Sequence, residues 1–193
     1  MPFEPLPGFA AWQHVEARQG FEVVFVQSGS DGFRFEGQTV AVEAEEPWWV
    51  HYVVELSLEW LTRRAMLSVR SAVATRSIVL EGDGDGHWRI DGQRQPHLDG
   101  CPDVDLESSA VTNTFPVHRL GLEPGQAADA PAAFVRAIDL SVERLDQHYE
   151  RLNDGDRGHR YHYLAPRFDA DFVLPYDASG LVVDYPGLAR RSH

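Results

Sequence analysis

Apolar residues recur at every second position along much of this chain, and this alternation constrains the fold more than any other feature. It occurs in residues 21–28 (FEVVFVQS), 33–45, 50–60, 65–71 and 77–82. Successive side chains of a β-strand face opposite sides of the sheet, so this spacing predicts strands. Turn-forming residues separate the segments, for example SGSDG at 28–32 and GDGDG at 82–86. The first half therefore predicts antiparallel strands joined by short turns.

The second half continues in the same way, with expected strands at 134–145, 160–165, 168–176 and 181–187. Helical spacing occurs only in 125–138 and 141–152, and the second segment could instead be a strand followed by one helical turn. We expect an all-β, mainly antiparallel fold with at most one or two short helices. Because long antiparallel sheets twist and curl, we expect a large curved sheet that forms a barrel or half-barrel. Its concave face is either filled by side chains or open to a ligand.

Two pairs of segments resemble each other at similar distances along the chain. VELSLEWL (54–61) resembles IDLSVERL (138–145), and SIVLEGDGDG (77–86) resembles DFVLPYDASG (171–180). Two similar meanders would explain this, but short alternating strands also resemble one another by chance. The chain of 193 residues has the size of a single domain, and we expect one β domain over residues 1–193.

The charged residues narrow the range of partners. The chain has 30 acidic and 17 basic residues, a net charge of −13, and all of its basic residues are Arg. An acidic protein repels phosphate backbones and anionic membrane surfaces, so we expect no nucleic-acid partner. The absence of Lys excludes a phosphate-binding Walker lysine and a Schiff base within this chain.

Cys101 is the only cysteine, so neither an internal disulfide nor a cysteine-based metal site can form. The first residues lack the features of a signal peptide, and no apolar run has the length of a membrane span. We expect a cytoplasmic protein with no stable membrane insertion. We also expect no cofactor and no metal, because His159 and His162 would face opposite sides of a strand and EGDGDG (81–86) is typical of a hairpin turn.

Several motifs occur in a fixed order in the C-terminal two-thirds. They are GDGDGHW (82–88), GCPDVDLE (100–107), TNTFPVHRL (112–120), Gln147 with Tyr149, RYHY (160–163) and DASGLVVDYPGLARR (177–191). With these motifs the chain resembles a bacterial family known as putative glycolipid-binding proteins, formerly a domain of unknown function. The resemblance implies a curved all-β fold with a hydrophobic cavity for a glycolipid, and it implies no catalytic residues.

The polar residues of these motifs are the candidate ligand-binding residues. They are Asp103, Asp105, Thr112, Asn113, Arg119, Tyr149, Tyr161 and Tyr185. Paired acids accept hydrogen bonds from sugar hydroxyls, and an arginine donates to an acidic or hydroxyl head group. The structural alternative is that Arg119 pairs with Asp103 or Asp105, while the TNT segment stabilises a turn through local hydrogen bonds.

Three functions are compatible with these patterns. We favour a non-catalytic protein that binds a small amphiphilic ligand, such as a glycolipid, in a cavity of the curved sheet. The first alternative is a hydrolase of a sugar or lipid ester that uses the Asp103 and Asp105 pair as acid and base. The second is a homodimeric interaction module, because exposed sheet edges can pair with another copy of the chain.

Overall fold

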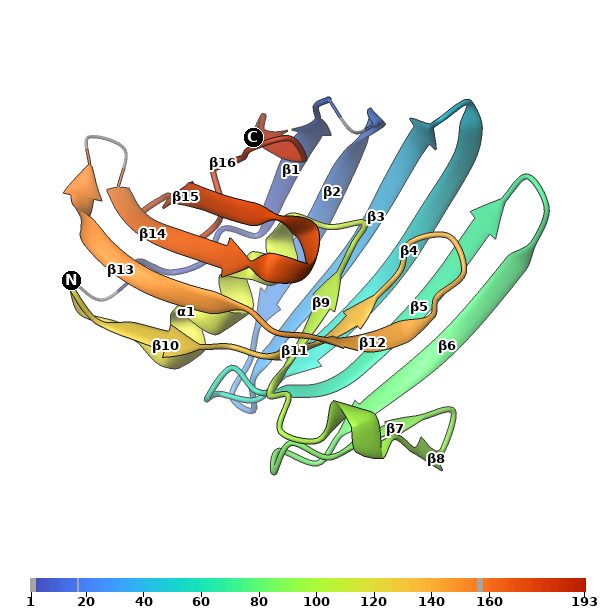
Figure 1. The fold of residues 1–193 in the computed structure, drawn as a ribbon, viewed down its shortest axis with the longest axis horizontal. Coiled ribbons are helices and arrows are strands. Elements are labelled where there is room, and N and C mark those ends of the chain that lie inside the picture. Colours follow the sequence, from blue (N-terminus) through green and yellow to red (C-terminus); the bar gives the residue numbers. More distant parts are fainter. Residues whose placement is uncertain (1–2, 17, 156–157) are drawn as a thin grey trace.

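Antiparallel strands dominate the structure, a computed structural model that describes residues 3–16, 18–155 and 158–193 (Figure 1). One large sheet has ten strands in the order β16-β17-β1-β2-β3-β4-β5-β6-β7-β8. Their bounds are β1 (Phe9–His14), β2 (Gln19–Ser28), β3 (Phe33–Glu43), β4 (Glu46–Leu56), β5 (Thr62–Ser71), β6 (Thr75–Gly82), β7 (Trp88–Ile90), β8 (Gln93–Arg94), β16 (Asp184–Tyr185) and β17 (Ala189–Arg191).

The large sheet is curved and open. Its first and last strands, β16 and β8, lie at opposite edges in the described part of the chain, so the sheet does not close on itself. Long antiparallel pairs such as β3 with β4, in register from Phe33 opposite Leu56 to Glu43 opposite Glu46, give it a strong twist. The prediction of a large curved, mainly antiparallel sheet is confirmed, in its half-barrel form.

Two smaller sheets lie in front of the large sheet in Figure 1. One has the order β10-β13-β14-β15, and the other has the order β12-β11-β9 with β9 and β11 parallel. Their bounds are β9 (Asp103–Leu106), β10 (Ala127–Asp129), β11 (Ala132–Val135), β12 (Val142–Leu145), β13 (His148–Gly155), β14 (Gly158–Ala165) and β15 (Ala170–Tyr176).

One short helix, α1 (Thr114–Leu120), connects these layers. Phe115 packs against Phe35 of the large sheet, with ring centroids 5.0 Å apart. Just before the helix, Asn113 accepts a hydrogen bond from Tyr149 of β13. Three 3-10 turns complete the secondary structure: η1 (Pro96–Leu98), η2 (Val111–Asn113) and η3 (Pro166–Phe168).

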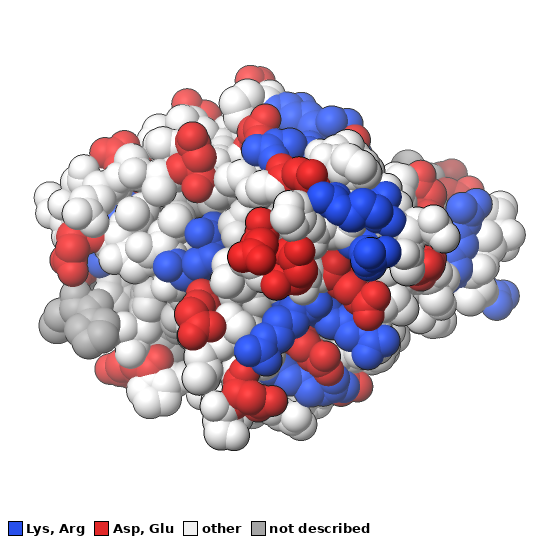
Figure 2. Space-filling view, turned by 90° about the horizontal axis from the view of Figure 1, so that it is seen from below, with Lys and Arg blue, Asp and Glu red and all other residues white. Residues whose placement is uncertain are grey.

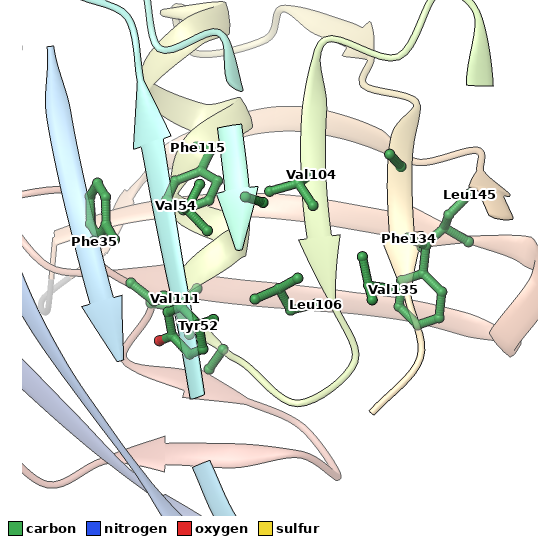
Figure 3. Packing of buried hydrophobic residues seen from close by; sticks show 14 of the residues in the cluster. Phe35, Tyr52, Val54, Val104, Leu106, Val111, Phe115, Phe134, Val135 and Leu145 are labelled. Atoms are coloured by element: carbon green, nitrogen blue, oxygen red, sulfur yellow. The ribbon is translucent and has the colours of Figure 1, made fainter. Parts of the chain in front are cut away.

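The core fills the space between the large sheet, the helix and β9 and β11. Figure 3 shows Phe35 and Val54 of the large sheet near Phe115, Tyr52 beside Val111, and Leu106 of β9 between them and β11. All of these side chains are at most 2% exposed. Burial of a large apolar side chain contributes about 1.5–3 kcal/mol, so this shared core holds the three layers together.

The two adjacent tryptophans of β4 face opposite sides of the sheet. Trp48 is 4% exposed and enters the core, while Trp49 lies on the other face of β4 and is only partly buried. Adjacent strand residues face opposite ways, as the sequence pattern requires.

The expected positions of helical structure are wrong. Residues 125–138 contain strands β10 and β11, and residues 141–152 contain β12 and most of β13. The helix lies instead in TNTFPVHRL. The expected strand at 134–145 is also interrupted, because Arg136 N–H donates to the Ser141 carbonyl and reverses the chain between β11 and β12. In the expected strand at 181–187, only Asp184–Tyr185 is a strand.

The similar segments of the sequence take different positions in the fold. Residues 54–56 end strand β4 in the large sheet, whereas residues 138–141 lie in the turn between β11 and β12. No helix in the described ranges is both long and apolar enough to span a membrane.

Candidate functional site

A cavity of about 340 Å³ lies between β9, β11 and β12 on one side and β14, β15 and β16 on the other. Its apolar wall consists of Leu106, Phe134, Leu145, Phe168, Ala170, Phe172, Tyr185, Pro186, Gly187 and Leu188. Its polar wall consists of Arg18, Asp105, Glu107, Ser109, Asn113 and Tyr163. Phe168 is 40% exposed, so the aromatic side of the cavity reaches the surface.

Asp105 is the acidic candidate that lines this cavity. It is 8% exposed and accepts hydrogen bonds at 2.7 Å from Thr112 Oγ1 and at 2.7 Å from Gln147 Nε2. Burial raises the pKa of Asp105, and these two hydrogen bonds oppose the rise. Because each carboxylate oxygen has a second lone pair, Asp105 retains capacity for a ligand donor.

Asp103 and Arg119 form a buried ion pair. Arg119 Nε lies 3.0 Å from Asp103 Oδ1, and Arg119 Nη2 lies 2.7 Å from Asp103 Oδ2. The side chains are 2% exposed for Asp103 and 15% for Arg119. This is the pairing anticipated as the structural alternative. It joins β9 to α1, and neither residue lines the cavity. The two aspartates are therefore not presented together to a ligand.

Thr112, Asn113 and Tyr149 are buried polar residues near the cavity, and each makes hydrogen bonds within the protein. The Tyr149 hydroxyl donates to Asn113 Oδ1 at 2.9 Å, and the Tyr176 hydroxyl donates to the Asn113 carbonyl at 3.3 Å. Thr112 Oγ1 also accepts a hydrogen bond from the backbone N–H of Leu106 at 3.3 Å. Only Asn113 of the three predicted residues lines the cavity, while Thr112 and Tyr149 hold its wall in place.

The remaining two predicted tyrosines lie in different places. Tyr185 lines the cavity, with its ring centroid 5.9 Å from that of Tyr163. Tyr161 lies beside a second cavity of about 270 Å³ with Phe3, His118 and Arg151. Burial raises the pKa of Tyr161 to about 12.

Several lining residues lay outside the predicted set. Tyr163, within the RYHY motif, accepts a hydrogen bond from Gln147 Nε2 at 3.0 Å. The rings of Phe134 and Phe168 lie 5.1 Å apart at their centroids. Arg18 lines the polar side. No sequence signal points to Arg18, because both alternating sets in residues 21–28 contain apolar residues and the pattern does not say which set faces inward.

No group of three or more metal-binding side chains occurs within residues 3–16, 18–155 and 158–193. His159 is buried, whereas His162 lies on the other face of β14 and is paired with Asp171 at 2.7 Å. Figure 2 shows arginines interleaved with acidic residues on one face of the molecule. That face offers no continuous basic surface of the kind that binds nucleic acid.

An open, curved antiparallel sheet covered by smaller sheets, with a small cavity between them, defines a β-barrel-like class of protein. A family model described as "Putative glycolipid-binding" matches residues 9–191. The chain belongs to this family, as its motifs predict.

Two solved structures are similar to this chain. A DUF1089-family protein from Pseudomonas aeruginosa has 34% sequence identity and a TM-score of 0.78, with 88% of this chain and 91% of that chain covered. A β-barrel-like protein of domain of unknown function DUF1849 from Brucella abortus has 8% identity and a TM-score of 0.52, with 95% and 92% covered, and shows the fold alone. No curated protein matches the chain.

Proposed function

We propose that this protein binds a small amphiphilic ligand of the glycolipid type in the cavity of about 340 Å³. The observation that carries the proposal is that one wall combines apolar side chains, with Phe134, Leu145 and Phe172, and a few polar groups, with Asp105 and Asn113. Small-molecule sites commonly combine mostly apolar walls with a few polar groups that fix orientation.

The size of the cavity sets the part of the ligand that fits. Ligand pockets commonly measure about 300–1,000 Å³, so this cavity suits a short chain or one segment of a longer ligand. Each buried CH₂ group contributes about 0.8 kcal/mol, and association costs a comparable total for a short chain. Polar contacts to the head group must therefore supply much of the affinity.

Asp105 and Asn113 can make such contacts without losing their present partners. Asp105 accepts one hydrogen bond at each oxygen from Thr112 and Gln147, which also hold the carboxylate in one orientation. A sugar hydroxyl that donates to Asp105 would meet an acceptor already in place, and a preorganised acceptor adds little ordering cost.

Two measurements on protein purified without detergent test the proposal. Native mass spectrometry followed by lipid extraction is expected to find a bound amphiphile. Titration with the neutral fluorescent probe N-phenyl-1-naphthylamine is expected to give saturable binding that decyl glucoside displaces. A protein that is empty and leaves the probe unaffected would contradict the proposal.

A cavity-filling variant locates the binding. Leu188 is partly buried and lines the cavity, so Leu188→Trp is expected to weaken probe binding at least about tenfold by occupying the space. Leu120→Trp is the matched control, because Leu120 is also partly buried but lies at the end of α1, away from the cavity. Equal binding by the two variants, both shown to be folded, would place the ligand elsewhere.

A further inference from the structure

Arg18 lies just before β2, lines the cavity and has hydrogen-bond donors that the described residues do not use. The residue is 7% exposed, yet its Nε and Nη1 have no hydrogen-bond partner among the described residues. Its Nη2 donates to the Glu107 carbonyl at 2.7 Å. Buried donors without acceptors cost free energy, and a buried charge costs more. This cost points to an acceptor that a ligand supplies.

The neighbouring carboxylates of Glu43 and Glu107 do not accept hydrogen bonds from the Arg18 guanidinium. Glu43 Oε2 lies 3.9 Å from Arg18 Nη1, beyond hydrogen-bond distance, and the Glu43 side chain is 41% exposed. The Glu107 carboxylate instead accepts hydrogen bonds at 2.8 Å from Arg136 Nη1 and at 2.8 Å from the Ala137 N–H. Its charge is therefore paired with another arginine.

Glu22, the third acid that influences Arg18, is fully buried and also has its own donors. It accepts hydrogen bonds from the Tyr52 hydroxyl at 2.6 Å and from the Ala110 N–H at 2.8 Å, and it contacts the Ser109 hydroxyl. Burial raises the pKa of Glu22, which favours its neutral form. Arg18 thus keeps a positive charge that no adjacent carboxylate pairs closely.

Two neighbours of Arg18 also have nitrogen atoms without hydrogen-bond partners. The Arg18 guanidinium carbon lies 5.2 Å from the ring centroid of Trp48, whose Nε1 has no partner in the described ranges. His14 is 5% exposed, and neither of its ring nitrogens is bonded to a described residue. Burial and then the charge of Arg18 lower the pKa of His14 to about 4. Unpaired donors of Trp48 and of the neutral His14 ring therefore lie near those of Arg18.

We propose that the ligand of this cavity carries an acidic group, a carboxylate or a phosphate, and that Arg18 binds this group through one of its unpaired donors, Nε–H or Nη1–H. This inference rests on the proposed function and names the class of amphiphile. A charge-assisted hydrogen bond from a guanidinium N–H to a carboxylate or phosphate oxygen is stronger than one to a neutral head group. The tail would lie along Phe134 and Leu145 on the apolar side.

The overall charge of −13 does not oppose such a contact. Salt screens exposed charges beyond about 10 Å at 0.1 M, whereas a buried pair at hydrogen-bond distance is screened much less. The local charge of Arg18 therefore decides the selectivity of the cavity.

A set of ten-carbon amphiphiles tests the inference. Decanoate, decyl phosphate, decanol and decyl glucoside would each compete with N-phenyl-1-naphthylamine for the full-length protein at pH 7.5. Hydrogen bonds to charged groups contribute about 1.5–3 kcal/mol, so at least one acidic compound is expected to bind roughly tenfold or more tightly than decanol. The two acidic compounds distinguish a carboxylate from a phosphate ligand.

Three variants assign the selectivity to Arg18. Arg18→Gln is expected to bind the acidic compound and decanol with about equal affinity, with binding of decanol unchanged. Arg18→Lys is expected to retain part of the preference for the acidic compound. Arg190→Gln, which makes the same change in net charge at a side chain that is 67% exposed, is expected to behave as the wild type. If Arg18→Gln does not fold, the Arg18→Lys result decides, since a shorter side chain that ends in a compact ammonium must lower the preference.

The outcomes separate this inference from the proposed function. Binding of decanol or decyl glucoside with no preference for acidic compounds would overturn the role of Arg18 and leave the proposed function standing. A preference that survives in Arg18→Gln would also overturn it. Failure of every amphiphile to bind would overturn both.

Discussion

At the scale of single residues, the buried pair of Asp103 and Arg119 shows how charge is used to join elements. Both guanidinium contacts lie within 3.0 Å, and burial raises the pKa of Asp103 while the hydrogen bonds and charge of Arg119 oppose the rise. Removing one partner of such a pair leaves a buried charge without compensation, which is usually strongly destabilising.

We therefore expect Arg119→Ala to lower the free energy of unfolding by about 3–5 kcal/mol. Urea denaturation monitored by tryptophan fluorescence measures this loss. Arg190→Ala, at an exposed arginine, should change stability by less than about 0.5 kcal/mol. Similar small effects of both substitutions would mean that the ion pair does not hold β9 to α1.

His118 connects stability to pH. Its ring stacks on Trp60 with centroids 3.8 Å apart. Its Nε2 lies 3.0 Å from the Ser179 carbonyl, which fits a neutral ring that donates a hydrogen bond from Nε2. Burial lowers the pKa of His118 to about 4 from the usual 6.5, with the Ser179 contact and Asp177 opposing this effect and His159 adding to it. The unfolded chain therefore binds a proton at a higher pH than the folded protein does.

Stability from His118 is present above pH 6.5 and is lost as the pH falls toward 4, by on the order of 3 kcal/mol in full. His118→Gln keeps a donor but does not titrate, so its free energy of unfolding should fall less between pH 7 and pH 4 than that of the wild type. Denaturant titrations across this range measure both. Parallel pH profiles of the two proteins would show that folding does not lower the pKa of His118.

Sequence alone could not place Glu22. In FEVVFVQS both alternating sets contain apolar residues, so the pattern does not say which set faces inward. In the structure Glu22, Val24 and Val26 are buried while Phe25 is 59% exposed. A buried Glu22 with an exposed Phe25 is possible because Tyr52 of β4 and the segment at 109–110 form hydrogen bonds with the Glu22 carboxyl group. These partners are distant from Glu22 in the sequence.

At the scale of elements, α1 is stabilised by packing against the rest of the protein and by the glycine that ends it. With seven residues it is too short for a helical period to be visible or for the isolated helix to be stable. Its sequence signals are local: Pro116 lies in the first turn, where its missing N–H is tolerated, and Gly121 follows the last residue. Pro116 lies within TNTFPVHRL and Gly121 directly follows it, but the TNT segment is also typical of a turn.

Gly121 ends the helix in the left-handed conformation, with φ of 55°, and its N–H bonds to the Val117 carbonyl. An added Cβ would have no atom within 4 Å, so the cost of a substitution is conformational. Gly121→Ala is expected to destabilise the protein by about 1–2 kcal/mol, and Gly121→Asn by less, because Asn adopts this conformation more readily.

Thermal unfolding of the two variants measures this difference. Equal stability of Gly121→Ala and the wild type would show that the end of α1 is not constrained. The turn between β11 and β12 could not be predicted in this way, because it places Leu140 at φ of 56°, where sequence patterns expect Gly or Asn.

At the scale of the whole molecule, period-two alternation was sufficient to predict the curved antiparallel sheet, since each long strand of the large sheet exposes one face to the core. It could not predict the cavity. The wall combines residues from Arg18 to Leu188, and their convergence depends on how the two smaller sheets pack against the large one. Of the predicted site, Asp105, Asn113 and Tyr185 meet at this cavity, while Asp103, Thr112, Arg119 and Tyr149 lie in the surrounding structure.

A larger hollow of about 560 Å³, lined by Val42, Trp48 and Trp49 among others, competes with the cavity as a ligand site. A crystal structure with a bromine-terminated ten-carbon amphiphile would distinguish the two through the anomalous signal of bromine. We predict bromine density among Phe134, Leu145 and Phe172. Density only beside Trp49, or none in a crystal soaked at saturating concentration, would contradict binding in the inner cavity.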